Sequence, residues 1–177
     1  MKSTNKISLT GIVYTPSRYV DPNQNENFTC FDLYHPCGGR KHNDRSITIR
    51  CVYPQPFAVK TWDRVKVTGY MRRGKFGPEI FVTSIERFDI KSTVSYNDIT
   101  LTGTVVQELN ESSTRFVILH SFGGSRNKRR SFMFPCLYPI SNAVSVNDKV
   151  KIRASIRDGY SYPEMFVKSL EIDNRAR

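Results

Sequence analysis

Residues 62–88, with the sequence WDRVKVTGYMRRGKFGPEIFVTSIERF, decide the fold because residues 147–172 repeat them as NDKVKIRASIRDGYSYPEMFVKSLEI. Identical residues recur at a constant offset of 85, including Asp63 with Asp148 and Glu79 with Glu164. Each copy contains two runs of alternating apolar and polar residues on either side of a glycine-containing loop, a pattern typical of paired β-strands. The repeat indicates an internal duplication of one small domain.

The similarity extends outward from this stretch towards the N-terminus. Residues 31–88 align without a gap with residues 116–173, and the Leu-Thr-Gly of residues 9–11 returns at residues 101–103. The alternation predicts five strands in the first copy, at residues 6–14, 28–35, 47–53, 65–70 and 80–85, and five at the corresponding positions of the second. Residues 15–27, rich in Pro, Asn and Asp, are predicted to form a long loop.

The connections at residues 55–62 and 140–147 are too short for a full helix. Five short strands with almost no helix are typical of a small closed or partly open barrel. The predicted fold class is therefore all-β, with one barrel in each half of the chain. The predicted domains are residues 1–90 and 98–177, joined by a linker at residues 91–97.

The formal net charge of +11 is shared by both halves, since residues 1–90 carry 14 basic and 8 acidic side chains and the remainder 13 and 8. Two basic domains favour nucleic acid as the partner over a membrane surface, and plain solubilising charge is the alternative. No segment approaches the roughly 20 apolar residues of a membrane span, and the polar start lacks the apolar core of a signal peptide. We expect a soluble cytoplasmic protein whose four cysteines are reduced thiols.

The order and spacing of the motifs resemble the OB-fold core of bacterial and phage single-stranded DNA-binding proteins. The matching residues are Leu9, Thr10, Gly11, Val13, Phe31, Leu33, 63–69, Arg72 and 79–85, with 101–105, 148–152 and 164–170 in the second copy. The resemblance covers nearly the whole chain. It implies two tandem five-stranded OB-fold barrels with little helix, single-stranded DNA as the partner, and no cofactor.

Binding of single strands requires cations that follow the phosphates and aromatic faces on which bases stack. On an OB barrel these groups lie on the outer face of the second and third strands and on neighbouring loops. The candidate nucleic-acid-binding residues are Tyr19, Tyr34, Arg40, Lys41, Arg45, Arg50, Arg72, Arg73, Lys75, Phe76, Arg126, Lys128, Arg129, Arg130, Arg153, Arg157, Tyr160 and Tyr162. The alternatives are a solvated face for the basic loop tips and local packing for the loop aromatics.

Strand parity separates the inner from the outer residues of each barrel. It places Phe31, Leu33, Phe116 and Ile118 inside. In the second copy the outward residues Val117, Leu119, Met133 and Leu137 are apolar, which predicts a protein interface. The second copy has Asn147 where the first has Trp62. Trp62 is predicted to belong to the core, with a stacking platform as the alternative.

Neither a metal site nor a catalytic site is predicted. His35, Cys37, His42 and Cys51 lie near one another in the sequence, but their spacing fits no common zinc module. No catalytic motif and no phosphate-binding glycine loop that opens a helix is present. We therefore expect a protein that is not an enzyme.

These features lead to three hypotheses. The first is a non-catalytic protein of a phage or mobile element that binds single-stranded DNA with low sequence specificity in DNA replication or recombination. The second is an accessory subunit that docks on a polymerase, primase or helicase, and the third is an RNA-binding protein. The expected partners are thus single-stranded DNA, with RNA as the alternative polymer, a replication protein and a further copy of this chain.

Overall fold

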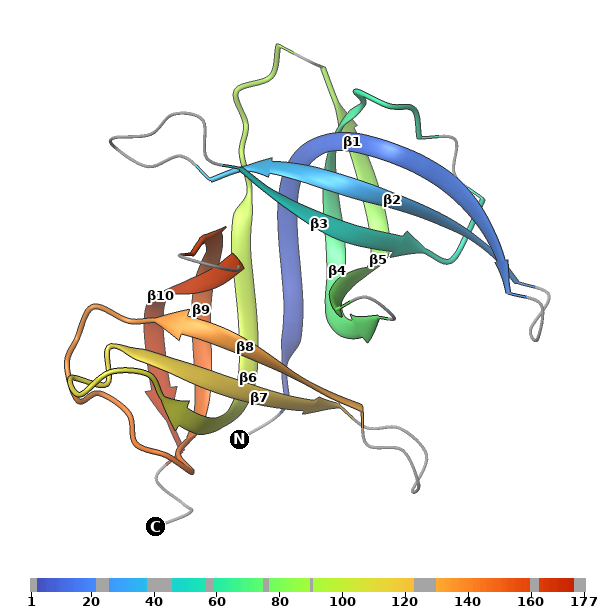
Figure 1. Cartoon of the computed structure of the whole chain (residues 1–177). Helices are drawn as coiled ribbons and strands as arrows, with labels where there is room; N and C mark the ends of the chain where they lie inside the picture. Colours follow the sequence, from blue (N-terminus) through green and yellow to red (C-terminus); the bar gives the residue numbers. More distant parts are fainter. Residues whose placement is uncertain are drawn as a thin grey trace. The chain divides into compact units, whose positions relative to one another are not determined.

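The structure is a computed structural model that describes residues 3–21, 26–37, 46–56, 59–74, 77–89, 91–122, 130–159 and 163–173. These ranges form ten β-strands and no helix, so the prediction of an all-β fold is confirmed (Figure 1). It follows that the described ranges hold no helix long and apolar enough to cross a membrane.

Contacts within the chain divide it into two compact units. The unit called here the N-terminal barrel is Ile7–Asn97, and the C-terminal barrel is Asp98–Arg177 together with Met1–Lys6. This division groups residues 91–97, which the sequence assigns to a linker, with the N-terminal barrel. The domain limits expected from the sequence stay a prediction.

The strand pairings of the N-terminal barrel close into a ring. Its strands are β1 (Asn5–Asp21), β2 (Glu26–Pro36), β3 (Ser46–Tyr53), β4 (Arg64–Gly74) and β5 (Gly77–Phe88). Neighbours follow the order β2-β3-β5-β4-β1, and β1 also pairs with β2 (Figure 1). The pairing of β3 with β5 is parallel and the others are antiparallel.

The C-terminal barrel repeats this topology. Its strands are β6 (Asn97–Glu108), β7 (Arg115–Phe122), β8 (Arg130–Leu137), β9 (Lys149–Asp158) and β10 (Pro163–Ile172). Their order is β6-β7-β8-β10-β9, with β6 also paired to β9, and β8 and β10 are the parallel neighbours. The consecutive pairs β6–β7, β7–β8 and β9–β10 are antiparallel, as direct connections between neighbouring strands allow.

Alternate residues of the strands fill the barrel interiors. Phe31 and Leu33 on β2 are at most 1% exposed, and Phe116 and Ile118 on β7 are fully buried. The inward parity predicted for these four residues is therefore confirmed. Burial of such side chains stabilises each barrel by about 1.5 to 3 kcal/mol per residue.

The region between β1 and β2 differs from the predicted loop at residues 15–27. Here β1 continues to Asp21, and Ser17–Asp21 pair with residues 26–30 of β2. Pro16 lies where the register shifts between Tyr14 and Ser17, so its missing N–H interrupts no regular ladder pair. The prediction of a loop was wrong for these residues because cross-strand pairing overrides the turn preference of Pro and Asp.

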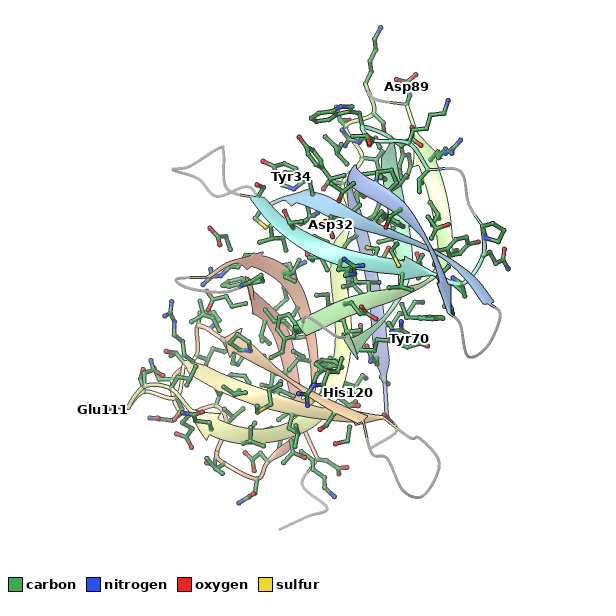
Figure 2. All side chains as sticks on the ribbon, turned by 45° about the vertical axis from the view of Figure 1, so that its right-hand side comes forward. Asp32, Tyr34, Tyr70, Asp89, Glu111 and His120 are labelled. Carbon is green, nitrogen blue, oxygen red and sulfur yellow. The ribbon has the colours of Figure 1, made fainter. Side chains whose placement is uncertain are left out.

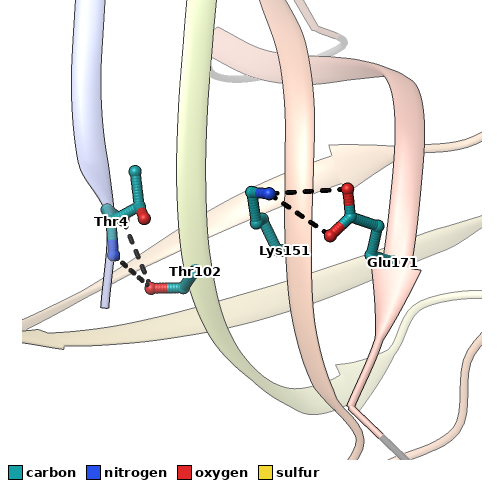
Figure 3. Close-up of polar contacts among 4 residues, drawn as sticks. All are labelled: Thr4, Thr102, Lys151 and Glu171. Atoms are coloured by element: carbon teal, nitrogen blue, oxygen red, sulfur yellow. Dashed lines mark hydrogen bonds and ion pairs between the residues drawn. The ribbon is translucent and has the colours of Figure 1, made fainter. Parts of the chain in front are cut away.

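A threonine on the first strand of each barrel forms hydrogen bonds with the backbone of a segment distant in the sequence. Thr102 donates its N–H to the carbonyl of Thr4 (2.9 Å). Its hydroxyl accepts from the N–H of Thr4 (2.9 Å), a bond that Figure 3 shows beside the Lys151–Glu171 ion pair. Thr10 makes the same two bonds with Tyr96, each 2.9 Å long. Both barrels therefore bind an extended segment at an equivalent position.

Candidate nucleic-acid interface

The outer face of β1, β2 and β3 carries polar and aromatic side chains in two rows. Strand register aligns Tyr14 with Asp32 and Asp32 with Arg50 in the first row. The second row aligns Tyr34 with Thr48. Side chains directly opposite one another lie about 5 Å apart at their Cβ atoms and share one face of the sheet. The structure thus places the predicted residues Tyr34 and Arg50 outward, both exposed to solvent, and Figure 2 labels Asp32 and Tyr34.

Three aromatic rings meet on this face and form what we call the aromatic cluster: Tyr14, Tyr34 and Trp62. The Tyr14 ring centroid lies 4.8 Å from that of Trp62 in an edge-to-face contact, and 6.4 Å from that of Tyr34. The exposed fractions are 38% for Tyr14, 37% for Tyr34 and 59% for Trp62. Large apolar surfaces of this kind are usually buried, so an exposed cluster indicates a binding surface.

The prediction that Trp62 belongs to the core was wrong. A turn before β4 places its backbone N–H on the carbonyl of Val13 (2.9 Å), beside Tyr14 on β1. The turn is stabilised by Asp63, whose carboxylate accepts from the N–H of Lys60 (2.9 Å). Because the backbone bond fixes Trp62 to the rim of β1, its indole extends over the outer face instead of entering the barrel.

Trp62 adopts a left-handed backbone conformation, with φ of 75°. Asn147 occupies the same place in the C-terminal barrel, also with φ of 75°, and donates its N–H to Val105 O (2.8 Å). Asparagine tolerates this conformation, whereas a bulky residue is strained there by roughly 1 to 3 kcal/mol. The N-terminal barrel therefore keeps a tryptophan where the backbone favours a small polar residue.

Asp32 is the one acidic residue in these two rows of described side chains. Its Oδ2 accepts a hydrogen bond of 2.8 Å from the hydroxyl of Thr15, at the irregularity of β1. Arg50 is opposite Asp32 on β3. Burial raises the pKa of the neighbouring Cys30 thiol, which is 5% exposed, and the charge of Arg50 acts against this shift. The face therefore combines hydrogen-bond acceptors, a cation and aromatic surfaces.

Two of the predicted DNA-binding arginines form ion pairs with buried carboxylates. Arg72 Nε lies 2.6 Å from Glu79 Oε1, and Arg157 Nη2 lies 2.7 Å from Glu164 Oε1. The glutamates are only 7% and 6% exposed, so each needs its arginine to offset the cost of burial. Each arginine also lies over an aromatic ring of its own barrel, Arg72 over Phe81 at 4.5 Å and Arg157 over Phe166 at 4.9 Å. Binding to phosphate would thus compete with a structural contact.

The remaining cations differ in their surroundings. Arg153 pairs with Asp98 at 2.9 Å, with both side chains exposed. Arg73 is exposed at the end of β4, opposite Pro78. The predicted residues Arg40, Lys41, Arg45, Lys75, Phe76, Arg126, Lys128, Arg129, Tyr160 and Tyr162, and the side chains of Tyr19 and Arg130, lie outside the described residues.

The equivalent outer face of the C-terminal barrel is apolar. Leu119 on β7 is opposite Met133 on β8, and Val117 is opposite Pro135. Met133 is 62% exposed, while Val117, Leu119 and Leu137 are half-buried. The structure therefore gathers the four residues of the predicted protein interface on one face; their function as an interface stays a prediction.

Both described histidines and three of the four cysteines are buried. His35 and His120 are 1% exposed, and each places Nδ1 on a threonine carbonyl, Thr10 O at 2.6 Å and Thr102 O at 2.5 Å. Burial lowers the pKa of both imidazoles. It raises the pKa of the Cys51 thiol well above its ordinary value. In the part of the chain that the structure describes, no three His, Cys, Asp or Glu side chains gather as metal ligands would.

No protein-family model and no curated protein sequence matches this chain. Solved structures do match. The crystal structure of the wild-type single-stranded DNA binding protein from Thermus aquaticus has a TM-score of 0.66 at 10% identity, over 99% of this chain and 95% of that chain. A deletion mutant (residues 228–252, with R190A) of the same protein also gives 0.66 at 10% identity, over 97% and 95%. The chain has the fold of these single-stranded DNA-binding proteins. The resemblance found in the sequence is thus confirmed for the fold.

The sequence-based candidates omit Tyr14, and they give Trp62 a stacking role only as the alternative to the core. Tyr14 follows the alternating run of β1 and has the parity of an outward residue, which the sequence pattern could have shown. For Trp62 the available signal was its counterpart Asn147, since a position that accepts Asn in one copy is a poor candidate for a buried core.

Proposed function

We propose that this chain is a non-catalytic protein that binds single-stranded DNA through the outer face of β1, β2 and β3 of its N-terminal barrel. The observation that carries the proposal is the exposed aromatic cluster of Tyr14, Tyr34 and Trp62 beside Arg50. Unpaired bases stack on such rings with about 1 to 3 kcal/mol each, and every base has a face to stack. Stacking therefore supports binding with low sequence specificity along most of a strand.

The strained backbone of Trp62 supports this proposal. A side chain that is both 59% exposed and held at φ of 75° contributes little to the core and costs conformational energy. Such strain is concentrated at functional sites, where another interaction compensates for it. Stacking on a nucleobase supplies that interaction.

The net charge of +11 and the fold support the same conclusion. A basic protein attracts a polyanion, and contacts with phosphates release counterions. The similar structures from Thermus aquaticus are described as single-stranded DNA binding proteins. We extend the proposal to a role in DNA replication or recombination, where single strands are exposed.

The test is a fluorescence anisotropy titration with oligo-dT, oligo-rU and duplex DNA at 50 and 200 mM salt. For about four phosphate contacts the affinity for oligo-dT falls roughly 50-fold over this range. Trp62→Asn weakens binding about tenfold at either salt concentration, because a stacked base is lost while the turn is kept. Binding of oligo-dT that is absent, or insensitive to salt, contradicts the proposal, and tighter binding of oligo-rU favours the RNA alternative.

A second function is favoured by the apolar outer face of the C-terminal barrel. Met133 is 62% exposed there, opposite Leu119, at positions equivalent to Thr48 and Tyr34 of the N-terminal barrel. We propose that this face docks on a replication protein. Met133→Glu and Leu119→Glu would abolish capture of a polymerase, primase or helicase while oligo-dT binding persists. Loss of DNA binding in these variants would instead assign the face to DNA.

A further inference from the structure

We infer that Asp32 and Arg50 form a guanine-selective subsite on the N-terminal barrel, with Tyr14 and Tyr34 as its stacking surface. This inference rests on the proposed binding of single-stranded DNA and goes beyond it, because it adds base selectivity at one position of the bound strand. The observation behind it is the carboxylate of Asp32, which lies on a face that otherwise suits a polyanion.

A carboxylate on this face opposes phosphate binding, since both groups are negatively charged. Asp32 is half-buried between the strands that carry Tyr14 and Arg50. It has about four lone-pair sites, of which the hydroxyl of Thr15 uses one. In the described residues no second side chain donates a hydrogen bond to it. Its remaining acceptor capacity is suited to the N–H groups of a base.

The register of β2 and β3 sets a cation directly beside this carboxylate. Asp32 and Arg50 are opposite one another, so their Cβ atoms lie about 5 Å apart on the same face. Guanidinium carries five N–H donors, and it can direct one to a ligand while others keep their contacts within the protein. The pair therefore presents a donor next to two acceptors.

Donor, acceptor, acceptor is also the pattern that cytosine presents to guanine. The pairing edge of guanine offers O6 as an acceptor, followed by the N1–H and N2–H donors. Arg50 would donate to O6, and the two oxygens of Asp32 would accept from N1–H and N2–H. Such a bidentate contact with a charged group is stronger than a neutral hydrogen bond.

The other bases do not match this pattern. Adenine and cytosine direct the lone pair of a ring nitrogen, N1 or N3, at the carboxylate, which is repulsive. Thymine offers a single N–H between two carbonyl oxygens. Guanine alone has two adjacent donors, so the pair of Asp32 and Arg50 selects it by hydrogen bonding as well as by the exclusion of its competitors.

The aromatic cluster supplies a surface against which this base would lie. Tyr14 is opposite Asp32 on β1, and Tyr34 lies two residues from Asp32 on the same face of β2. Both rings are exposed by more than a third. A base that pairs with Asp32 thus has Tyr14 opposite Asp32 on β1 and Tyr34 two residues further along β2, and stacking on these rings holds its pairing edge in place.

The C-terminal barrel lacks every element of this subsite. The counterparts of Asp32, Tyr34 and Arg50 at the offset of 85 are Val117, Leu119 and Pro135. None of these side chains donates or accepts a hydrogen bond. Selectivity is therefore assigned to the N-terminal barrel alone.

Asp32 has one other function in the structure, which is to hold the irregular part of β1 through Thr15. Asp32→Asn separates the two functions. The amide oxygen still accepts from Thr15, but the amide nitrogen replaces one acceptor with a donor and mismatches guanine. Glu86→Gln is the matched control, because it removes one negative charge from β5, where Glu86 pairs with Lys66 at 3.5 Å.

The experiment compares oligonucleotides of equal length by anisotropy: oligo-dT, and alternating thymine with guanine, adenine or hypoxanthine. The wild-type protein binds the guanine oligomer on the order of tenfold more tightly than oligo-dT or the adenine oligomer. Hypoxanthine, which lacks the N2 amino group, loses most of this gain. Asp32→Asn abolishes the gain, measured within the variant as the ratio of its affinities for the guanine oligomer and for oligo-dT, whereas Glu86→Gln retains this ratio.

Two results would overturn the inference. One is equal affinity of the wild-type protein for all four oligomers, and the other is a guanine preference that survives in Asp32→Asn. Both leave salt-dependent binding of oligo-dT intact, so they are distinct from a failure of the proposed function, in which no oligomer binds. Thermal unfolding of each variant confirms that the comparison is made between folded proteins.

Discussion

The two barrels share a scaffold and differ on their outer faces. The shared contacts are the buried pairs of Arg72 with Glu79 and Arg157 with Glu164, and the bonds from His35 and His120 to threonine carbonyls. A further shared feature is the turn before β4 and before β9, which contains Trp62 in one barrel and Asn147 in the other, both with φ of 75°. All of them hold backbone in place, and none presents a chemically distinctive group to solvent except Trp62.

The outer faces differ at the positions of Tyr34, Arg50 and Trp62. Where the N-terminal barrel has Tyr34, Arg50 and Trp62, the C-terminal barrel has Leu119, Pro135 and Asn147. Outward side chains of a sheet can change without disturbing the core, because alternate residues point to opposite faces. The comparison teaches that the two barrels keep the same contacts inside the fold while they present different side chains to solvent.

The largest expected effect comes from giving the N-terminal face the residues of its counterpart. Tyr34→Leu with Trp62→Asn removes two stacking rings while it keeps residues that the same backbone already accepts in the other barrel. We expect a loss of about 3 kcal/mol in the free energy of oligo-dT binding, roughly 100-fold in Kd, by anisotropy.

The reciprocal variant, Leu119→Tyr with Asn147→Trp, is the control. It should bind oligo-dT at least as tightly as the wild-type protein, because the rings of the N-terminal barrel are untouched. Equal losses in both double variants would end the functional distinction between the barrels.

A smaller effect is expected from the ion pairs that the barrels share. Glu79→Gln and Glu164→Gln each weaken a charge-assisted hydrogen bond to an arginine and should lower the free energy of unfolding by about 2 kcal/mol. Urea denaturation measures this change. A large loss for one variant and none for the other would show that the two scaffolds are not equivalent.

The smallest effect concerns the buried histidines. Burial lowers the pKa of His35 and His120 in the folded state, so the unfolded chain binds more protons as the pH falls below about 6.5. The contribution of these histidines to stability is therefore fully present above the unfolded pKa. The wild-type protein should lose it as the pH falls from 7 to 5. His35→Gln and His120→Gln should each flatten this dependence, by a few degrees in Tm.

Differential scanning fluorimetry at several pH values measures the dependence. The two variants should behave alike, since the Nδ1 contacts are alike. If the variant that carries both His35→Gln and His120→Gln keeps the pH dependence of the wild-type protein, the loss of stability belongs to the carboxylates instead.

The strands and their inner residues could be predicted because alternation is a local signal. Phe31, Leu33, Phe116 and Ile118 are buried as the parity requires. The repeat strengthens this prediction, because the same alternation occurs in both copies. The extension of β1 through Ser17–Asp21 was missed, since its pairing with β2 depends on a partner and not on the residues themselves.

The candidate site was only partly predictable. Arg50 and Tyr34 follow from strand parity, and the structure places both outward. That Arg72 is engaged by Glu79 could not be seen, because the two residues face each other only when β4 and β5 pair. The outward parity of Tyr14 is visible in the sequence, but its contacts with Tyr34 and Trp62 are not, because they join three separate segments of the chain.

The sequence by itself determined that two basic all-β units of one design follow each other in this chain, because the offset of 85 and the alternation are properties of residue order. Only the tertiary structure decided where the side chain of Trp62, the first residue of the stretch 62–88, lies. Trp62 reads as a core residue by its hydrophobicity. The backbone bond to Val13 holds it outside, beside Tyr14. The residue type sets how apolar a side chain is, whereas the path of the backbone determines the side of the barrel on which the side chain lies.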